Sequence, residues 1–407
     1  MSSFEKSSAD PLATGERVKW NRETRGVSRK ELAGRVGRSD EWVRLLEVEG
    51  RGAERLSNLI DLARALGMSD ISALVGFEVR PLNPVGVPEH PAVAEVRVAL
   101  SRALLAPAPG PPCSLESMRN RVRHAWAGWR ISRTQYMTLG SVLPALLTDA
   151  VALVRYAPDQ DRREANRLLT HVYLLAQRFA YCVGAGALAT RCTDRALLAA
   201  DQADDPELLA LAGWASAMTS LAAGQPEEAT EIALCAGEHI LHPSNEHEAA
   251  LRGSLLLFAA MGAARACHPA DAWRYWDEAA TFAEQLRHDY QHPHTQFSGA
   301  NVSVYGVAID VETGNAKAAA SRAALLDARE IPSTNRRAQH YIDVARGHHQ
   351  AGRMGEVLPA LLSSVAESRE TIVYSADARG LVTSLVRSSK PSQDLQLAKL
   401  ARMLDIT

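Results

Sequence analysis

Three closely spaced histidines are the side chains of this sequence best suited to binding a metal ion. His288, His292 and His294 lie in one short stretch, but no cysteine or carboxylate accompanies them at a ligand spacing. Zinc sites are built from such ligands at short, regular intervals. We therefore expect a loop at these histidines, with no metal site and no cofactor.

The sequence also lacks motifs of catalysis. It has no GxGxxG after a strand, no phosphate-binding GxxxxGK[S/T], no HExxH and no GxSxG. Its cysteines are odd in number and form no CxxC pair, which suits small core residues in a reducing compartment better than a disulfide framework. They are Cys113, Cys182, Cys192, Cys235 and Cys267. We expect a protein that is not an enzyme.

A stripe of aromatic and amide side chains could bind an effector. Phe297, Asn301 and Tyr305 are four residues apart and share one face of a helix predicted over residues 295–313. An asparagine amide both donates and accepts, so it can hold a peptide bond. A satisfied contact between helices explains the same stripe, and the two interpretations stay open.

Basic residues are concentrated near the N-terminus. Between Arg17 and Arg38 there are eight basic residues and two acidic ones. Arg29 and Lys30 open a predicted helix, where side-chain charge and free amides can both bind a phosphate. A solvated basic face is the alternative interpretation. The motif in which these residues lie, described below, favours phosphate contact.

The next predicted helix could contact bases. Arg44 could bind guanine through two hydrogen bonds, while Asp40 or Glu41 could accept from cytosine N4. The alternative interpretation is that the two carboxylates contact no base and only interact favourably with the positive end of the helix dipole. The two interpretations are equally supported. The predicted DNA-binding residues are Arg29, Lys30, Arg38, Ser39, Asp40, Glu41 and Arg44.

Short helices with clear caps must position these residues. Ser28 and Glu31 have the spacing of a capping box, and Ser39 caps the following helix after a turn at Gly37. The segment resembles the helix-turn-helix of the XRE (phage-repressor/Cro-like) family. The resemblance is carried by Arg22, Gly26, Ser28, Glu31, Leu32, Ala33, Val36, Gly37, Ser39, Trp42, Val43, Leu46 and Glu47.

The resemblance implies a five-helix domain that binds double-stranded DNA. RLSNLIDLARALGM and SDISALVG match the family's fourth and fifth helices. Asn21 departs from the pattern, because the family has an apolar residue there; the adjacent Trp20 could supply that packing. Arg29 replaces a glutamine that is frequent in the family.

Short turns, all but one of them containing glycine, recur through the C-terminal region. Their centres lie at residues 184, 224, 267, 314 and 352, each between two Ala-rich helical segments. Glycine suits the left-handed residue that ends the first helix, and proline suits the start of the second. The pattern resembles a degenerate TPR-like (tetratricopeptide-type) array of helical hairpins, with a generic α-bundle as the alternative.

Composition agrees with an all-α protein. Hydrophobic residues make up 46% of the 407 residues and aromatics only 5%, so small and straight-chain apolar side chains dominate, and these favour helix. Eight of nineteen prolines fall within residues 81–112, which predicts a linker holding at most a short helix. The predicted parts are a flexible N-terminus (1–13), a helix-turn-helix domain (14–77), a linker (78–113) and a TPR-like α-solenoid (114–407).

Nothing in the sequence favours a membrane protein. The longest uncharged run, residues 208–226, contains Ser, Thr and Gln, which predicts a buried helix. The N-terminal stretch lacks the apolar core of a secretory signal, so we expect a cytoplasmic protein. The net charge of -2 excludes a uniformly basic coat but allows a local basic patch.

The order of the two regions resembles cytoplasmic transcription regulators, above all an actinobacterial group that shares HPAVAEVRVAL, LGSVLPALLTDA and HTQFSGANVSVYGVAIDVETGNA. This implies a regulator of transcription whose array binds a peptide, a small molecule or a partner protein. We expect a homodimer on an inverted-repeat operator, because one helix-turn-helix contacts only a few base pairs and two-fold pairing extends the site. The alternative is an interaction scaffold whose small domain docks a protein. The acidic pair Asp40 and Glu41 is the feature that favours it.

Overall fold

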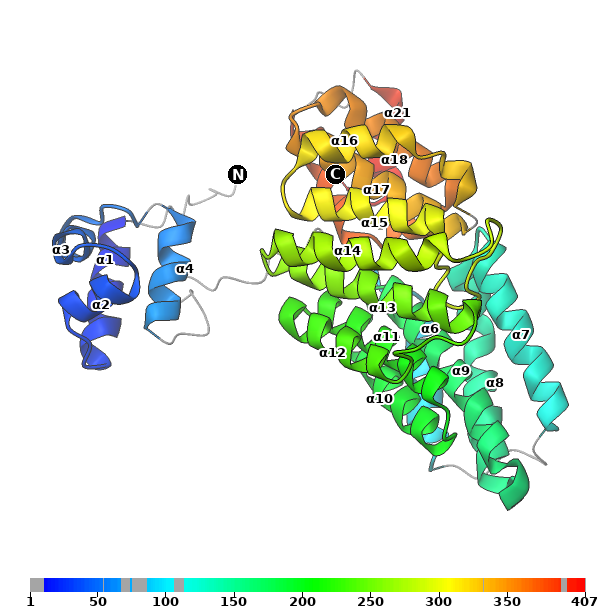
Figure 1. Cartoon of the computed structure of the whole chain (residues 1–407). Helices are drawn as coiled ribbons and strands as arrows, with labels where there is room; N and C mark the ends of the chain where they lie inside the picture. The colour runs from blue at the N-terminus through cyan, green and yellow to red at the C-terminus, as the bar shows by residue number, and fades with distance from the viewer. Residues whose placement is uncertain are drawn as a thin grey trace, which may run out of the picture. The chain divides into compact units, whose positions relative to one another are not determined.

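The chain is all-α, as the composition predicts. The computed structural model describes residues 11–53, 55–66, 74, 86–105, 113–331, 333–388 and 394–406, and it contains no strand within them. Contacts divide the chain into two compact units, Met1–Asn83 and Pro84–Thr407 (Figure 1). Each unit has its own hydrophobic core.

The first unit is a small bundle of short helices. Its apolar side chains, among them Val18, Leu32, Val43 and Leu46, are fully buried in one core. The fifth helix expected over residues 69–76 lies outside the described residues, except for Leu74, which is buried in the same core. The helices are α1 (Pro11–Thr24), α2 (Arg29–Arg35), α3 (Asp40–Glu49) and α4 (Leu56–Ala65).

The prediction that Trp20 packs in place of an apolar residue at position 21 is wrong. Trp20 is 65% exposed, whereas Asn21 itself is buried. Asn21 tolerates burial because its Nδ2 donates to Arg17 O at 2.9 Å and its Oδ1 accepts from Arg25 at 2.8 Å. The polar residue is therefore satisfied in place, and no neighbouring side chain replaces it.

A buried ion-pair network joins three helices of this unit. The side chain of Glu47 on α3 is inaccessible to solvent and accepts from Arg22 Nη2 at 3.0 Å and from Arg29 Nε at 2.8 Å. Arg22 also donates to the carbonyl of Val27 at 3.0 Å. Burial raises the pKa of Glu47, but hydrogen bonds from Arg22 and Arg29 lower it, and the net pKa lies below the ordinary value. Glu47 is therefore ionised at neutral pH.

The second unit begins with three helices and continues as a row of helical hairpins. The expected short helix between Pro91 and Pro107 is α6, and its buried face packs against α8. The opening helices are α6 (Ala92–Arg102), α7 (Leu115–Ile131) and α8 (Gln135–Tyr156). The hairpins are α9/α10 (Arg162–Cys182, Gly186–Gln202), α11/α12 (Pro206–Ala222, Pro226–Glu238), α13/α14 (Glu246–Arg265, Pro269–Glu284), α15/α16 (Gly299–Glu312, Ala316–Leu325) and α17/α18 (Thr334–Gln350, Met354–Glu367). They are followed by α19 (Arg369–Val373), α20 (Ala376–Ser388) and α21 (Leu395–Met403).

The five predicted turn centres all adopt the left-handed conformation. Gly184, Gly224, Gly314 and Gly352 have φ between 70° and 78°, and Cys267 takes the same role with φ of 62°. A left-handed residue lets the carbonyls at the end of one helix find partners before the next helix begins. The local sequence therefore determines each hairpin.

The first helices of the hairpins stack on one another and form the inner layer. In Figure 1 they follow in chain order from green to orange, and each of α9, α11, α13 and α15 contacts the next first helix. Fifteen of the twenty residues of α13 are buried, against two of the sixteen in α14. A helix that is apolar all round must be covered on all sides, which explains why the second helices lie outside.

A carboxylate from the end of this unit caps a helix near its beginning. Glu370 accepts the backbone N–H groups of Tyr136 at 2.8 Å and Met137 at 3.0 Å, in the first turn of α8. Thr334 Oγ1 donates to Ser132 O at 3.1 Å beside it. The row of hairpins is therefore curled, so that α17 and α19 meet the start of α8.

One described helix is long and apolar enough to span a membrane by length and composition alone. This helix is α8, and half of its most apolar window is buried inside the protein. Leu143 and Leu147 on it are fully buried in the main core. Most of the longest uncharged run lies in α11, which is largely buried, as predicted. Both helices have core positions in this fold.

Close helix packing predicts opposite effects of alanine at two glycines. A Cβ on Gly213 would lie 2.3 Å from Ala236 Cβ, so Gly213→Ala should lower the free energy of unfolding by about 1–3 kcal/mol. Gly380 is helical with open space around it, so Gly380→Ala should raise that free energy by about 0.5–1 kcal/mol. Thermal unfolding of both full-length variants checks this. A stabilised Gly213→Ala protein would contradict the packing.

The Glu47 network predicts the stability of the first unit. Glu47→Ala removes the buried carboxylate partner of Arg22 and leaves the exposed Glu23 beside it, which should cost about 3–5 kcal/mol. Hydrogen exchange of backbone amides in the full-length protein should then show most protection lost in α1 and α3. Glu41→Ala is the matched control, because its pair with Arg44 is exposed. Equal protection in the two variants would rule out a structural role for the network.

Candidate functional site

The first candidate site is the pair α2 and α3 with the turn between them. Ser28 Oγ accepts from Glu31 N at 3.1 Å and Ser39 Oγ accepts from Trp42 N at 3.1 Å, so both helices begin at a capped residue. Gly37 provides the left-handed turn with φ of 64°. Only half of the predicted capping box forms. The Ser28 side chain accepts from the Glu31 amide, whereas the Glu31 carboxylate pairs with Arg35 at 2.6 Å. The first turn of α3 is left exposed to solvent.

The structure separates the two predicted phosphate-binding residues at the start of α2. Arg29 is half-buried, and its guanidinium forms an ion pair with Glu47 as part of the buried network. Any contact with a phosphate would be made alongside this ion pair. Lys30 is exposed and makes no ion pair within the described residues. Lys30 is therefore the cation at this helix end that remains available to an anion. Sequence reasoning missed the engagement of Arg29, because its partner lies eighteen residues away.

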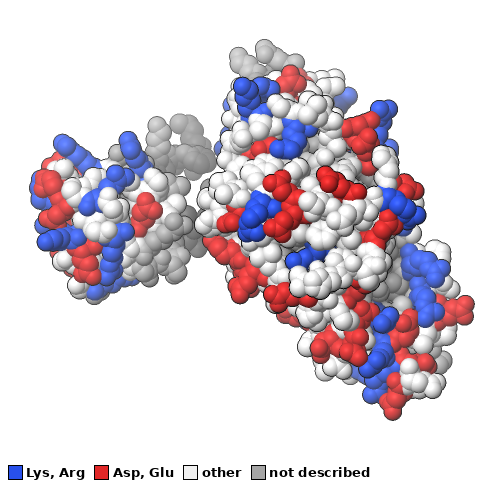
Figure 2. Space-filling model, viewed as in Figure 1, with Lys and Arg blue, Asp and Glu red and all other residues white. Residues whose placement is uncertain are grey.

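The predicted base-contacting residues lie together on the exposed side of α3. Arg44 donates to Glu41 through two hydrogen bonds, at 2.7 and 2.8 Å, and this bonding lowers the pKa of Glu41. Arg38 lies over the ring of Trp42, with 5.5 Å to its centroid, and Asp40 and Ser39 are exposed. Basic and acidic side chains alternate over the visible face of this unit (Figure 2). Binding of guanine by Arg44 must replace its bond to Glu41.

The second candidate site is a cavity on the inner layer of the second unit. Its volume is about 470 Å³, and the first helix of each hairpin contributes a side chain to it. Asn301 and Tyr305 both line it, as does Arg336, whose Nε donates to Asn301 Oδ1 at 2.9 Å. The guanidinium of Arg336 lies 4.3 Å from the centre of the Tyr305 ring. Two of the three predicted effector residues therefore face a cavity.

Phe297 does not belong to this group. The helix predicted over residues 295–313 begins only at Gly299, because Ser298 caps it by accepting from Asn301 N at 3.3 Å. Phe297 lies before the cap, is fully buried, and fills the space against Gly253, where a Cβ would meet its ring at 2.2 Å. Its function is packing between α13 and the loop.

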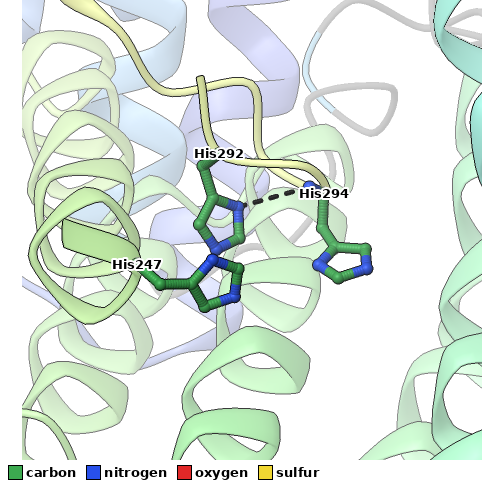
Figure 3. A group of neighbouring side chains, drawn as sticks. All are labelled: His247, His292 and His294. Carbon is green, nitrogen blue, oxygen red and sulfur yellow. Dashed lines mark hydrogen bonds between the residues drawn. The ribbon is translucent and has the colours of Figure 1, made fainter. Parts of the chain in front are cut away.

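The predicted histidine cluster has a different membership. His292 and His294 do lie in a loop, between α14 and α15, but the third ring beside them is His247 from the first turn of α13 (Figure 3). One nitrogen from each ring lies within 4.8 Å of the others. His288 is exposed and does not join them. Sequence spacing could not identify His247, because it is more than forty residues away.

The hydrogen bonds of His292 argue against a three-histidine metal site. Its Nδ1 accepts the backbone N–H of His294 at 3.3 Å and of Thr295 at 3.0 Å. A neutral imidazole that accepts at Nδ1 carries its proton on Nε2, and a protonated nitrogen has no lone pair for a metal. Burial lowers the pKa of His292 and His294 well below the ordinary value, so both rings are neutral. The cluster is part of the packing between this loop and α13.

A wider groove lies between α7 and α8. Its volume is about 880 Å³, and its walls include Trp129, Leu139, Val142 and Leu146. Val142 is 40% exposed there. No sequence signal marks this groove, because the apolar residues of α8 that line it have the same spacing as those that enter the core.

Buried histidines predict an acid-sensitive second unit. Burial, with a smaller effect from Arg336, lowers the pKa of His340 to about 4, against about 6.5 in the unfolded chain. The buried, neutral His340 contributes fully to stability above the pKa that this residue has in the unfolded chain. The contribution is lost as the pH falls towards its pKa in the folded protein. The loss should be about 2 kcal/mol between about pH 7 and pH 5. Unfolding curves at both pH values should show a smaller drop for His340→Gln than for the wild type.

The exposed His288 supplies the control, and His288→Gln should keep the full drop of the wild type. The same drop in both variants would mean that His340 is protonated in the folded protein.

Comparisons of the sequence with known proteins found no match. No protein-family model matches the sequence, and no curated protein matches it.

Proposed function

We propose that the chain is a DNA-binding transcriptional regulator of the XRE type. In this proposal α2 and α3 form a helix-turn-helix that binds an operator in double-stranded DNA. The second unit is a TPR-like array that binds an effector and thereby changes operator affinity. No catalytic activity forms part of the proposal.

The capped pair α2 and α3 is the observation that carries the proposal. A second helix enters the major groove when a tight turn sets it against a supporting helix and its N-terminal residues face outward. Ser39, Asp40 and Glu41 are exposed in the first turn of α3, while Val43 and Leu46 hold the opposite face in the core. The buried pair of Arg22 with Glu47 anchors α3 from behind.

The stacked hairpins support a binding function for the second unit. Arrays of helical hairpins present an inner surface assembled from many repeats, and such surfaces bind peptides, proteins or small molecules. Here the inner helices enclose the cavity that contains Asn301 and Tyr305. A cavity of about 470 Å³ is in the range that small ligands occupy.

The proposal includes a homodimer in the cytoplasm. One helix-turn-helix contacts only a few base pairs, and two-fold pairing extends the site to an inverted repeat. The five cysteines are all free thiols, which agrees with a reducing compartment. A scaffold whose first unit docks a protein is the competing proposal, and Asp40 and Glu41 remain its support.

Selection of genomic DNA fragments distinguishes the two proposals. The full-length protein should enrich a few fragments that share an inverted repeat at about 150 mM salt. A chain lacking residues 1–80 should enrich none. Enrichment that survives the truncation, or a selected set that matches random DNA, would favour the scaffold.

Two substitutions should separate phosphate contact from base contact. Lys30→Ala should weaken binding to selected and random DNA alike and reduce the salt slope by about 0.9. Arg44→Ala should weaken binding only to selected fragments, by about tenfold or more. Fluorescence anisotropy at several salt concentrations measures both. Lys317→Ala, an exposed lysine of α16, should change neither. A general loss of affinity from Arg44→Ala would contradict base contact.

A further inference from the structure

Two arginines in the cavity of the second unit have no carboxylate partner. Arg178 on α9 and Arg336 on α17 both line the cavity and form no ion pair within the described residues. Arg178 Nε and Arg336 Nη2 are shielded from solvent and have no hydrogen-bond partner. Unpaired buried donors are costly, so their presence in a cavity calls for an explanation.

The other charges of the cavity are already matched. Arg265 and Arg346 both bind Glu312, at 3.2 and 3.0 Å, and Arg346 also lies 3.5 Å from Asp343 and 3.7 Å from Asp377. With Arg178 and Arg336 included, four guanidinium groups face three carboxylates. The cavity therefore carries one positive charge in excess, and a ligand with one negative charge would balance it.

Aromatic rings hold both guanidinium groups in place. Arg178 lies 4.8 Å from the centre of the Trp214 ring, and among the described residues its Nη1 donates to the weak acceptor Met218 Sδ, at 3.3 Å. Arg336 lies over Tyr305 and is held by Asn301. Stacking on an aromatic face reduces the freedom of a guanidinium without using all of its N–H groups. The two side chains are therefore preorganised to bind an anion.

We infer that Arg178 and Arg336 form a binding site for the carboxylate of a ligand whose apolar body lies against Trp214, Phe258 and Tyr305. A guanidinium presents planar N–H groups that match a carboxylate. A single negative charge fits the excess of the cavity, whereas a phosphate dianion exceeds it. This inference rests on the proposed function, because it names the chemical class of the effector.

Matched acids and amides test the inference without DNA. The probes are N-acetyl-tryptophan and short peptides with a free C-terminal carboxylate, each compared with its amide, and inorganic phosphate. Thermal unfolding and calorimetric titration of the full-length protein measure binding. The acids should raise the unfolding midpoint and bind at least about tenfold more tightly than the amides, since a hydrogen bond to a charged group is stronger than one to a neutral group. Preference for the single amino acid or for the peptides identifies the source of the carboxylate.

Substitutions of the two arginines complete the test. Arg336→Gln and Arg178→Gln should each remove the preference for acids, while Arg274→Gln, whose exposed pairs with Asp271 and Glu278 lie outside the cavity, should keep it. Equal binding of acids and amides, tighter binding of phosphate, or no binding of any carboxylate probe would overturn the inference. A failed DNA selection would instead overturn the proposed function, because these titrations contain no DNA.

Discussion

One carboxylate holds the two ends of the curved second unit together. The first amides of a helix have no partners within the helix, and α8 obtains its partners from Glu370, which lies 234 residues after Tyr136. Burial raises the pKa of Glu370, while the amides of Tyr136 and Met137 lower it. Small rotations between successive hairpins curve such an array, and this cap holds its two ends together around the cavity. The cavity is a consequence of that curvature.

The two candidate sites use arginine in opposite ways. In the first unit the buried Glu47 engages Arg22 and Arg29, so these guanidinium groups position α3. In the second unit Arg178 and Arg336 are held by rings and amides, which leaves their charge unbalanced. A carboxylate partner turns a guanidinium into a structural element. An aromatic neighbour leaves it able to bind a ligand.

Local patterns in the sequence were sufficient for much of this structure. The helical class, the capped starts of α2 and α3 and the five left-handed turns follow from residues within a few positions of one another. Contacts between distant residues were not predictable. Glu47 with Arg29, Glu370 with α8, and His247 with His292 join segments whose separation carries no periodic signal. The position of Phe297 was missed for a different reason, since Ser298 was not recognised as the cap.

The repeated left-handed turns also bear on how the chain folds. Each hairpin closes a loop of only a few residues, so its contacts form at low entropic cost and before distant ones. Neighbouring hairpins then supply most of each other's buried surface, as in other linear arrays. The bond from Glu370 to α8 spans the whole array and requires every hairpin to be in place. We expect it to be the last contact made in folding and the first lost in unfolding.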